Sequence, residues 1–244
     1  MITCGLSIII ITLNEEARLP RLLDDLLAQS FQDFEIIHVD SQSQDRTVAI
    51  SKARKHLFSR YQIIEMNDRG VSLGRNTGAS AASGRRLLFL DADTRLKTDF
   101  LAESVAEVDR AGAGVGIPQM SADGLRWHYR VGFGAFNLGI KASSFVYPTA
   151  VGACLFSTPD IHVAIGGFDP DISLCEDCNY VLKAFRLNKQ PNRVLQSKFS
   201  FDPRRLEQDG FVATGLIYLK ANLHRALVGE IRDREIDYPF GHYQ

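Results

Sequence analysis

Apolar and polar positions follow two different periodicities along the first 110 residues. The run LSIIIITLN, which starts at Leu6, is continuous and rich in β-branched residues, as expected of a strand buried on both faces of a parallel sheet. Leucines then recur three and four positions apart from Leu19 to Leu27, which predicts a helix with one apolar face. The chain is therefore expected to begin with a strand and a helix.

This order of strand and helix repeats along the next segments. The runs FEIIHVD, YQIIEMN and RRLLFLDAD have the length and composition of strands. Helices are expected over about 47–57, after a loop within 70–84, and over 98–112, where Thr98 or Asp99 would cap the helix. Strands that alternate with helices predict an α/β fold, a Rossmann-like and mostly parallel central sheet flanked by helices.

The second half of the chain is less regular. Residues 112–160 are rich in glycine and aromatic residues, which is typical of core or acceptor-site packing, of an amphipathic helix pair, or of a membrane-facing patch. A helix is expected to begin near Glu176, and a long amphipathic helix follows residue 210. With no repeat and no clean boundary, we expect one domain over 1–244, divided into a nucleotide-binding half (1–110) and an acceptor-binding half with the C-terminal helices (111–244).

The composition is that of an ordinary globular protein, with 45% hydrophobic and 23% charged residues. The net charge of −1 gives no indication of a nucleic-acid partner. No apolar run reaches the roughly 18 residues that a membrane-spanning helix needs, and residues 6–13 are too short a run for a signal peptide. We expect a cytoplasmic protein, with peripheral contact at the inner face of the membrane left open.

Four cysteines are scattered along the chain, and two of them, Cys175 and Cys178, form a C-x-x-C pair. A four-cysteine zinc site would need a second close pair, but Cys4 and Cys154 lie far apart in the sequence. Reduced thiols are therefore the preferred interpretation.

Polar side chains follow three of the predicted strands, at the point where each strand ends. Asn14 and Glu15 follow the first strand, Asp40 ends the second, and Asp91 and Asp93 end the fourth. One acid after a strand is usually a helix cap, but ligands of open parallel sheets bind outside the carboxyl ends of the strands. Acids after three strands therefore predict a ligand site at this edge.

The D-x-D sequence of Asp91, Ala92 and Asp93 suggests a metal ion. Mg²⁺ and Mn²⁺ accept carboxylate oxygens and keep positions for water and substrate phosphates. A bound cation would also relieve the repulsion between the two carboxylates and neutralise charge on a departing diphosphate. The pattern often arises by chance, and its place directly after a buried strand strengthens the prediction.

A second acidic pair, Glu176 and Asp177, follows a Gly-Gly-Phe-Asp turn. Acids in the first turn stabilise a helix, and the pattern alone favours that structural role. The functional interpretation is a general base, which must lie within hydrogen-bond reach of an acceptor hydroxyl.

Taken together, these segments resemble family 2 glycosyltransferases of the GT-A fold. The resemblance covers roughly residues 5–190, in the order of the family. It is carried by SIIIITLNEEARLPRLLDDLLAQSFQDFEIIHVDSQSQDRT, GRNTGASAASGRRLLFLDADTRL and GGFDPDISLCEDCNYVLKAFR.

The resemblance implies a nucleotide-sugar site formed by residues that follow the strands or lie in the GRNTGA segment: Thr12, Asn14, Glu15, Asp40, Asp45, Arg75, Asp91 and Ala92. Asp40 would meet the base, commonly uracil or guanine, and Asp45 would close its loop. Arg75 would approach the base, the ribose or the diphosphate. The donor would be a nucleoside-diphosphate sugar, most often linked to UDP or GDP.

The resemblance also implies the metal and the catalytic groups. Asp91 would lie near the ribose or donor sugar, and Asp93 would be the better ligand for Mn²⁺ or Mg²⁺. Asp177 would be the catalytic base of an inverting, hexosyltransferase-type displacement, supported by Glu176. The base would deprotonate an acceptor hydroxyl while the metal eases departure of the nucleoside diphosphate.

One departure from the family concerns the segment after the acidic pair. Processive members carry Q-x-x-R-W there, whereas this chain has FDPRRLEQDG, which predicts a non-processive enzyme. Arg204 and Arg205 could clamp a diphosphate in bidentate fashion or form a solvated pair, and we favour the phosphate role.

Three questions stay open at the level of sequence. A catalytically inactive nucleotide-sugar-binding protein could use the same scaffold, although all the required acids are present. A sugar nucleotidyltransferase is disfavoured, because TLNEEARLP stands where a glycine-rich phosphate loop is expected. The acceptor could be a glycan hydroxyl or a lipid-linked phosphate, and Arg126, Arg130 and Lys141 would suit anionic lipid.

Overall fold

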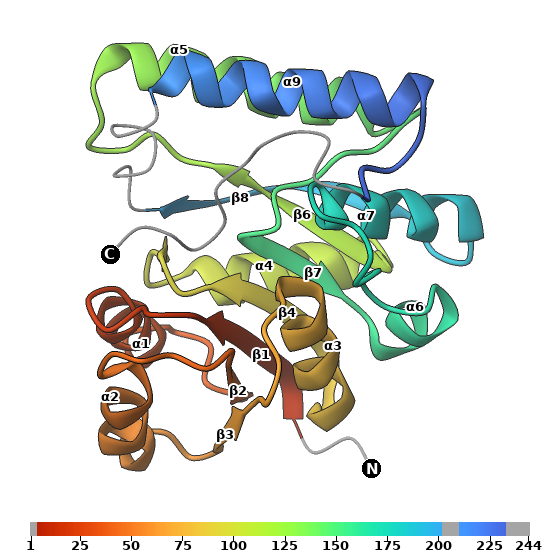
Figure 1. Cartoon of the computed structure of the whole chain (residues 1–244). Helices are drawn as coiled ribbons and strands as arrows, with labels where there is room; N and C mark the ends of the chain where they lie inside the picture. Colours follow the sequence, from red (N-terminus) through yellow and green to blue (C-terminus); the bar gives the residue numbers. More distant parts are fainter. Residues whose placement is uncertain (1–3, 202–209, 233–244) are drawn as a thin grey trace.

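The predicted alternation of strands and helices is present in the first half of the chain. A computed structural model (Figure 1) describes residues 4–201 and 210–232. The first-half strands are β1 (Cys4–Thr12), β2 (Phe34–Asp40), β3 (Tyr61–Glu65) and β4 (Gly84–Asp91). The helices are α1 (Leu19–Leu27), α2 (Thr47–Arg54) with the 3₁₀ turn η1 (Lys55–Leu57), α3 (Val71–Ala81) and α4 (Phe100–Arg110). These four strands are parallel, as predicted.

The second half adds strands that the sequence did not predict. Its strands are β6 (Val115–Met120), β7 (Cys154–Ser157) and β8 (Asn192–Phe201), and its helices are α5 (Trp127–Ser143), α6 (Pro159–Ala164), α7 (Glu176–Leu187) and α9 (Phe211–Leu227). The short strand β5 (Thr94–Arg95), in the first half, was not predicted either. The strand order is β3-β2-β1-β4-β7-β6-β8-β5. Because β7 runs antiparallel to both β4 and β6, the sheet is mixed at its centre.

Of the three interpretations left open for residues 112–160, the helix pair within that segment is not found. That segment holds β6, β7 and a single long helix, α5. Both β6 and β7 are short, and β6 contains Gly116 and Pro118, so neither gives a periodic signal. The long helix that accompanies α5 at the same end of the molecule is α9, from later in the chain (Figure 1).

Two apolar clusters cover the two faces of the sheet. In β1, Ile8 and Ile10 pack with α1 and α4, whereas Ile9 packs with α3, α6 and α7. Successive side chains of a strand point to opposite faces, so a strand covered on both sides needs an unbroken apolar run. This is the physical origin of the run that starts at Leu6.

Small residues let α3 lie close to β1. A Cβ atom at Gly78 would lie 2.3 Å from Cγ2 of Ile9, so only glycine fits there without movement. The close approach carries Arg75, one turn earlier on α3, to the carboxyl edge of the sheet.

Two helix starts correct or confirm the predicted boundaries. α4 begins after Asp99, but no side chain caps it, so the predicted Thr98 or Asp99 side-chain cap is wrong; the carbonyl of Asp99 accepts from the N–H of Glu103 instead. α7 begins at Glu176, as predicted.

No helix among the described residues is both long enough and apolar enough to span a bilayer.

Candidate active site

The loops after β1 and β2 are joined by hydrogen bonds at the carboxyl edge of the sheet. The N–H of Asn14 donates to Oγ of Ser43 (2.8 Å), and Oδ1 of Asn14 accepts from the N–H of Gln44 (2.8 Å). Asp45 accepts from the N–H of Glu16 at 3.0 Å. Asn14 and Asp45 therefore hold the two loops together, and their predicted contacts with a nucleotide stay predictions.

Asp40 is buried and held in one orientation at the end of β2. Its Oδ1 accepts from Thr12 Oγ1 (2.8 Å) and Ser43 Oγ (2.6 Å), and its Oδ2 accepts from the N–H of Ser43 (2.8 Å). A carboxylate oxygen has two lone pairs, so Oδ2 has room for one more donor. An imide N–H of a base is a donor of the required kind.

A buried chain of polar groups lies behind Asp40. It runs from the hydroxyl of Tyr61 through Ser51 to Nδ1 of His38, with contacts of 2.8 Å and 2.7 Å. Nε2 of His38 lies 2.8 Å from the Thr12 hydroxyl that donates to Asp40. Burial lowers the pKa of His38 to about 4, so the imidazole is neutral. No sequence pattern predicted this series of polar groups, although the lone histidine inside the apolar run FEIIHVD was a signal for it.

Arg75 joins the D-x-D strand to the second acidic pair. Its side chain is 2% exposed, and its Nη1 donates to Glu176 Oε1 at 2.7 Å. Its Nη2 donates to Asp91 Oδ1 (3.0 Å) and to the carbonyl of Gly152 (3.0 Å). The guanidinium therefore lies between the end of β4 and the start of α7, and its predicted approach to the nucleotide stays a prediction.

Gly152 and the Phe168 ring complete the Arg75 site. A Cβ atom at Gly152 would lie 2.9 Å from Nη2 of Arg75 and 3.2 Å from Cβ of Asp177, so a larger residue would push the guanidinium away. The Phe168 ring lies 5.1 Å from Cζ of Arg75, and Asn76 fixes its backbone through two hydrogen bonds of 2.7 and 2.8 Å. No sequence motif indicated Gly152, whereas Phe168 belongs to the Gly-Gly-Phe-Asp turn, which was noted without a role for its ring.

Asp177 is the most strongly perturbed acid of the site. Burial raises its pKa to about 7, the Glu176 carboxylate adds to the increase, and Arg75 opposes it. Three carboxylates surround one guanidinium here, so negative charge is in excess. A carboxyl that loses its proton near neutral pH can act as a general base. The geometry therefore brings the predicted base together with Glu176, Arg75 and Asp91.

The backbone at the start of α7 holds Asp177 in place. Cys175 precedes the helix in the left-handed region, with φ of 65°, which is uncommon for a residue with a side chain. The N–H of Cys178 donates to Oδ1 of Asp177 at 2.7 Å. Cys175 and Cys178 pack against Ala221 of α9. All four cysteines of the chain are buried free thiols, in line with the expectation of reduced cysteines.

Asp93 is the second acid of the D-x-D loop. It borders a cavity of about 230 Å³ between the start of α1 and the end of β8. The lining residues are Arg18, Arg21, Ala92, Asp93, Arg95, Asp123, Leu125, Ser200 and Phe201. The cavity has room for part of a ligand at the second acid of the pair.

These side chains fit a divalent metal only if the protein and a bound phosphate group both supply ligands. The described residues contain no cluster of three or more His, Cys, Asp or Glu side chains that could hold a metal ion. Asp91 is paired with Arg75, and Asp93 borders the cavity between α1 and β8. Magnesium-like ions are often bound by one or two carboxylates plus substrate phosphates, so the residues fit a metal that arrives with a diphosphate.

Arg204 and Arg205, which were predicted to bind a diphosphate, lie outside the described residues.

The chain is similar to a known protein family and to known glycosyltransferases. The family model described as "Glycosyl transferase family 2" matches residues 7–154. A "PGL/p-HBAD biosynthesis glycosyltransferase" of Mycobacterium bovis is 38% identical over 137 residues, 54% of this chain and 52% of that protein. "Poly(ribitol-phosphate) beta-N-acetylglucosaminyltransferase TarS" of Staphylococcus aureus is 28% identical over 201 residues, 79% of this chain and 34% of that protein. The chain spans about half the length of the first relative and about a third of the second.

Solved structures share the fold. "Mannosyltransferase PcManGT from Pyrobaculum calidifontis in complex with GDP-Man and Mn2+" aligns with a TM-score of 0.76 and 19% identity, over 97% of this chain and 66% of that chain. Staphylococcus aureus TarS in complex with UDP-GlcNAc aligns with a TM-score of 0.64 and 20% identity, over 80% of this chain and 58% of that chain. The GT-A fold predicted from the sequence is confirmed.

Proposed function

Because the chain belongs to glycosyl transferase family 2, we propose that it transfers a hexose from a nucleoside-diphosphate sugar to an acceptor in a metal-dependent, inverting and non-processive reaction. The observation that carries this proposal is the position of buried Arg75, which contacts both Asp91 and Glu176. Beside this ion pair, burial and the Glu176 carboxylate raise the pKa of Asp177 to about 7, against the opposing effect of Arg75. A base poised near neutral pH beside the D-x-D strand is what such a transfer needs.

The donor is proposed to lie along the carboxyl edge of the sheet. Asp40 accepts from the base, with Thr12 holding its carboxylate in place, and Asp91 lies near the ribose or sugar. UDP- and GDP-linked sugars are the favoured donors, since TarS has been solved with UDP-GlcNAc and PcManGT with GDP-Man. The cavity beside Asp93 then receives the diphosphate end of the donor.

In the transfer step, the acceptor hydroxyl attacks the anomeric carbon while Asp177 takes its proton. The bond between the sugar and the diphosphate oxygen breaks as the new glycosidic bond forms, so one displacement inverts the anomeric centre. The Glu176 carboxylate helps to raise the pKa of Asp177, so that Asp177 ionises only near neutral pH. Glu176 is itself held by a hydrogen bond from Arg75. A divalent metal held by Asp93, with Asp91 nearby, would supply charge neutralisation for the leaving diphosphate.

The proposal covers two classes of acceptor, a glycan hydroxyl and a lipid-linked phosphate. A phosphate acceptor carries no proton that must be removed, so it would depend little on Asp177. The proposed compartment is the cytoplasm, where buried free thiols such as those found here stay reduced.

The proposal is tested by incubating the protein with UDP-linked and GDP-linked sugars and measuring release of the nucleoside diphosphate. We expect release from donors of one base, with a loss of at least tenfold when EDTA removes Mn²⁺ or Mg²⁺, because bound metal stabilises the leaving diphosphate. Release that is equal with and without EDTA would refute the metal requirement. Tight donor binding with no release from any donor and acceptor would favour the inactive binding protein.

A further inference from the structure

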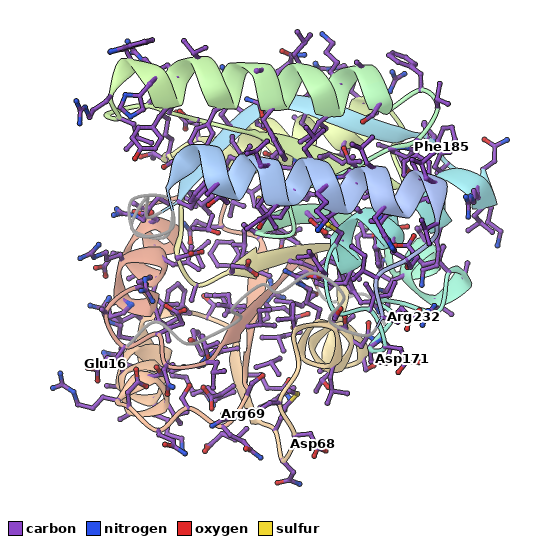
Figure 2. The ribbon with its side chains drawn as sticks, turned by 45° about the horizontal axis from the view of Figure 1, so that its top comes forward. Glu16, Asp68, Arg69, Asp171, Phe185 and Arg232 are labelled. Carbon is purple, nitrogen blue, oxygen red and sulfur yellow. The ribbon has the colours of Figure 1, made fainter. Side chains whose placement is uncertain are left out.

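Two long helices lie along one end of the molecule, beyond β6 and β8. Figures 1 and 2, which differ by 45°, both show α5 and α9 running along this end. Each helix has 17 residues, and neither contains an Asp or Glu. Each packs one face on the body of the protein, α5 through Tyr129 and Phe133 and α9 through Ala221. Their opposite faces therefore form the outer surface of this end.

The outer faces of both helices are apolar. On α5, Trp127, Val131 and Leu138 share one face and are 74, 63 and 68% exposed. On α9, four leucines recur at helical spacing and are each more than half exposed. We define the α5–α9 surface by its exposed apolar residues: Trp127, Val131, Leu138, Phe145, Val146, Leu216, Leu219, Leu223, Leu227 and Val228. Exposed apolar residues gathered on two helices at one end of a protein indicate an interaction site.

The charges on this surface have one sign. Arg126, Arg130, Lys141 and Lys220 are exposed on or beside the two helices. Within residues 4–201 and 210–232, the acid that precedes α5 and the acid that follows α9 are paired, because Asp123 contacts Lys97 (2.6 Å) and Glu230 contacts the buried Arg225 (2.8 Å). In this described part of the chain, the α5–α9 surface combines exposed apolar side chains with cations.

We propose that the α5–α9 surface binds an anionic lipid bilayer. Helices that carry apolar residues and Lys or Arg on one surface lie in the membrane interface, with the apolar side chains among the acyl chains and the cations at acidic headgroups. A second copy fits less well, because a two-fold contact would bring together two surfaces that both carry positive charge. Negative headgroups, by contrast, complement every charge on the surface.

This docking would bring the active site next to the lipid. Ile217, Tyr218 and Ala221, on the inner side of α9, pack with Cys175 and Cys178, the residues that flank Asp177. A membrane-bound acceptor would thus meet the enzyme near its proposed base. This consequence rests on the proposed function, whereas lipid binding itself does not.

Lipid binding is tested by sedimenting the whole chain with vesicles of phosphatidylcholine, with and without phosphatidylglycerol. We expect binding only when phosphatidylglycerol is present, and a steep loss of binding in high salt. Two variants address the surface, one with Leu219→Gln and Leu223→Gln and one with Arg130→Glu and Lys220→Glu. Since each cation near an anionic surface contributes about fivefold to binding, the charge variant should lose at least tenfold. The leucine variant should lose a comparable factor, because binding scales with the apolar area buried in the interface.

Matched controls come from exposed residues elsewhere in the fold. Val163→Gln on α6 and Lys55→Glu on η1 are exposed and lie in other elements, so they should bind vesicles like the wild type. All variants should keep the melting temperature and the release of nucleoside diphosphate from a soluble donor. Failure of the proposed function would abolish that release and leave vesicle binding intact.

Three outcomes would overturn the proposal. The first is equal binding of the wild type and both surface variants to anionic vesicles. The second is binding to phosphatidylcholine alone that matches binding to the anionic mixture. The third is a solution dimer that the leucine variant dissociates by analytical ultracentrifugation, which would identify a second copy as the occupant.

Discussion

The variant Asp177→Asn is expected to lose about three orders of magnitude in kcat/KM for a hydroxyl acceptor, because a positioned general base contributes roughly 10²–10⁴-fold. The amide keeps the shape of the side chain but cannot accept a proton. In the wild type, activity should rise with pH through about 7, the value to which burial and the Glu176 carboxylate raise the pKa of Asp177. The measurement is the pH dependence of nucleoside diphosphate release in the presence of acceptor.

The same variant should be more stable than the wild type in alkaline buffer. Asp177 has a higher pKa in the folded protein than in the unfolded chain, so the folded state holds its proton more tightly between about pH 4 and 7. Wild-type stability therefore falls as the pH rises through this range. The amide of the variant would not ionise, and without added metal the variant should gain on the order of 4 kcal/mol at pH 8, because each unit of pKa difference corresponds to about 1.4 kcal/mol.

A matched control for Asp177 is Asp171→Asn. Asp171 lies just before α7, and its side chain is 80% exposed. Its Oδ2 lies 3.8 Å from Nη1 of Arg232; both residues are labelled in Figure 2. This change should leave both activity and stability near wild-type values. An Asp177→Asn enzyme with near-normal activity on a hydroxyl acceptor would show that the base has been assigned to the wrong residue.

The variant Arg75→Met is expected to lose about 3–5 kcal/mol of unfolding free energy, as happens when one partner of a buried ion pair is removed. Glu176 and Asp91 would each lose their charged partner, and Gly152 would lose a hydrogen bond. Because Arg75 lowers the pKa of Asp177, its removal should also move the pH dependence of any remaining activity to higher pH. Thermal unfolding and the pH profile measure these two effects separately.

Arg85→Met is the control, because Arg85 lies on β4 but forms an exposed pair with Asp109 (3.1 Å). Exposed pairs contribute about 0–1 kcal/mol, so this variant should unfold close to the wild type. Arg75→Lys should fall between the two, since an ammonium cannot reach three acceptors with the planar geometry of guanidinium. Unfolding of Arg75→Met at the wild-type temperature would refute the bridging role.

The sequence predicted the first half of the fold because that half is periodic. Strands buried on both faces must be unbroken apolar runs, and α1 shows its leucines at helical spacing. The acids at Asp40, Asp91 and Asp93 stand directly at strand ends, so their gathering at one edge followed from the parallel sheet alone.

The rest depended on contacts between distant segments. Arg75 and Glu176 lie 101 residues apart, and no local pattern links them. Gly152 was invisible for the same reason, since its importance comes from the guanidinium that packs against it. The central strands β6 and β7 were missed because short strands carry little periodicity. The pairing of Asp91 with Arg75, 16 residues earlier in the chain, likewise had no local signal.

The central claim is that this edge of the sheet binds a nucleoside diphosphate through Asp93 and a divalent metal, and thermal stability measures it most directly. UDP and GDP are added separately, with and without Mn²⁺, to the wild type, to Asp93→Asn and to the exposed control Asp160→Asn. A ligand at 100 times its dissociation constant should stabilise the protein by about 2.7 kcal/mol. We expect one nucleotide to stabilise the wild type and the control only with Mn²⁺, and Asp93→Asn to lose the effect. Stabilisation that is independent of metal, or that persists in Asp93→Asn, would contradict the claim.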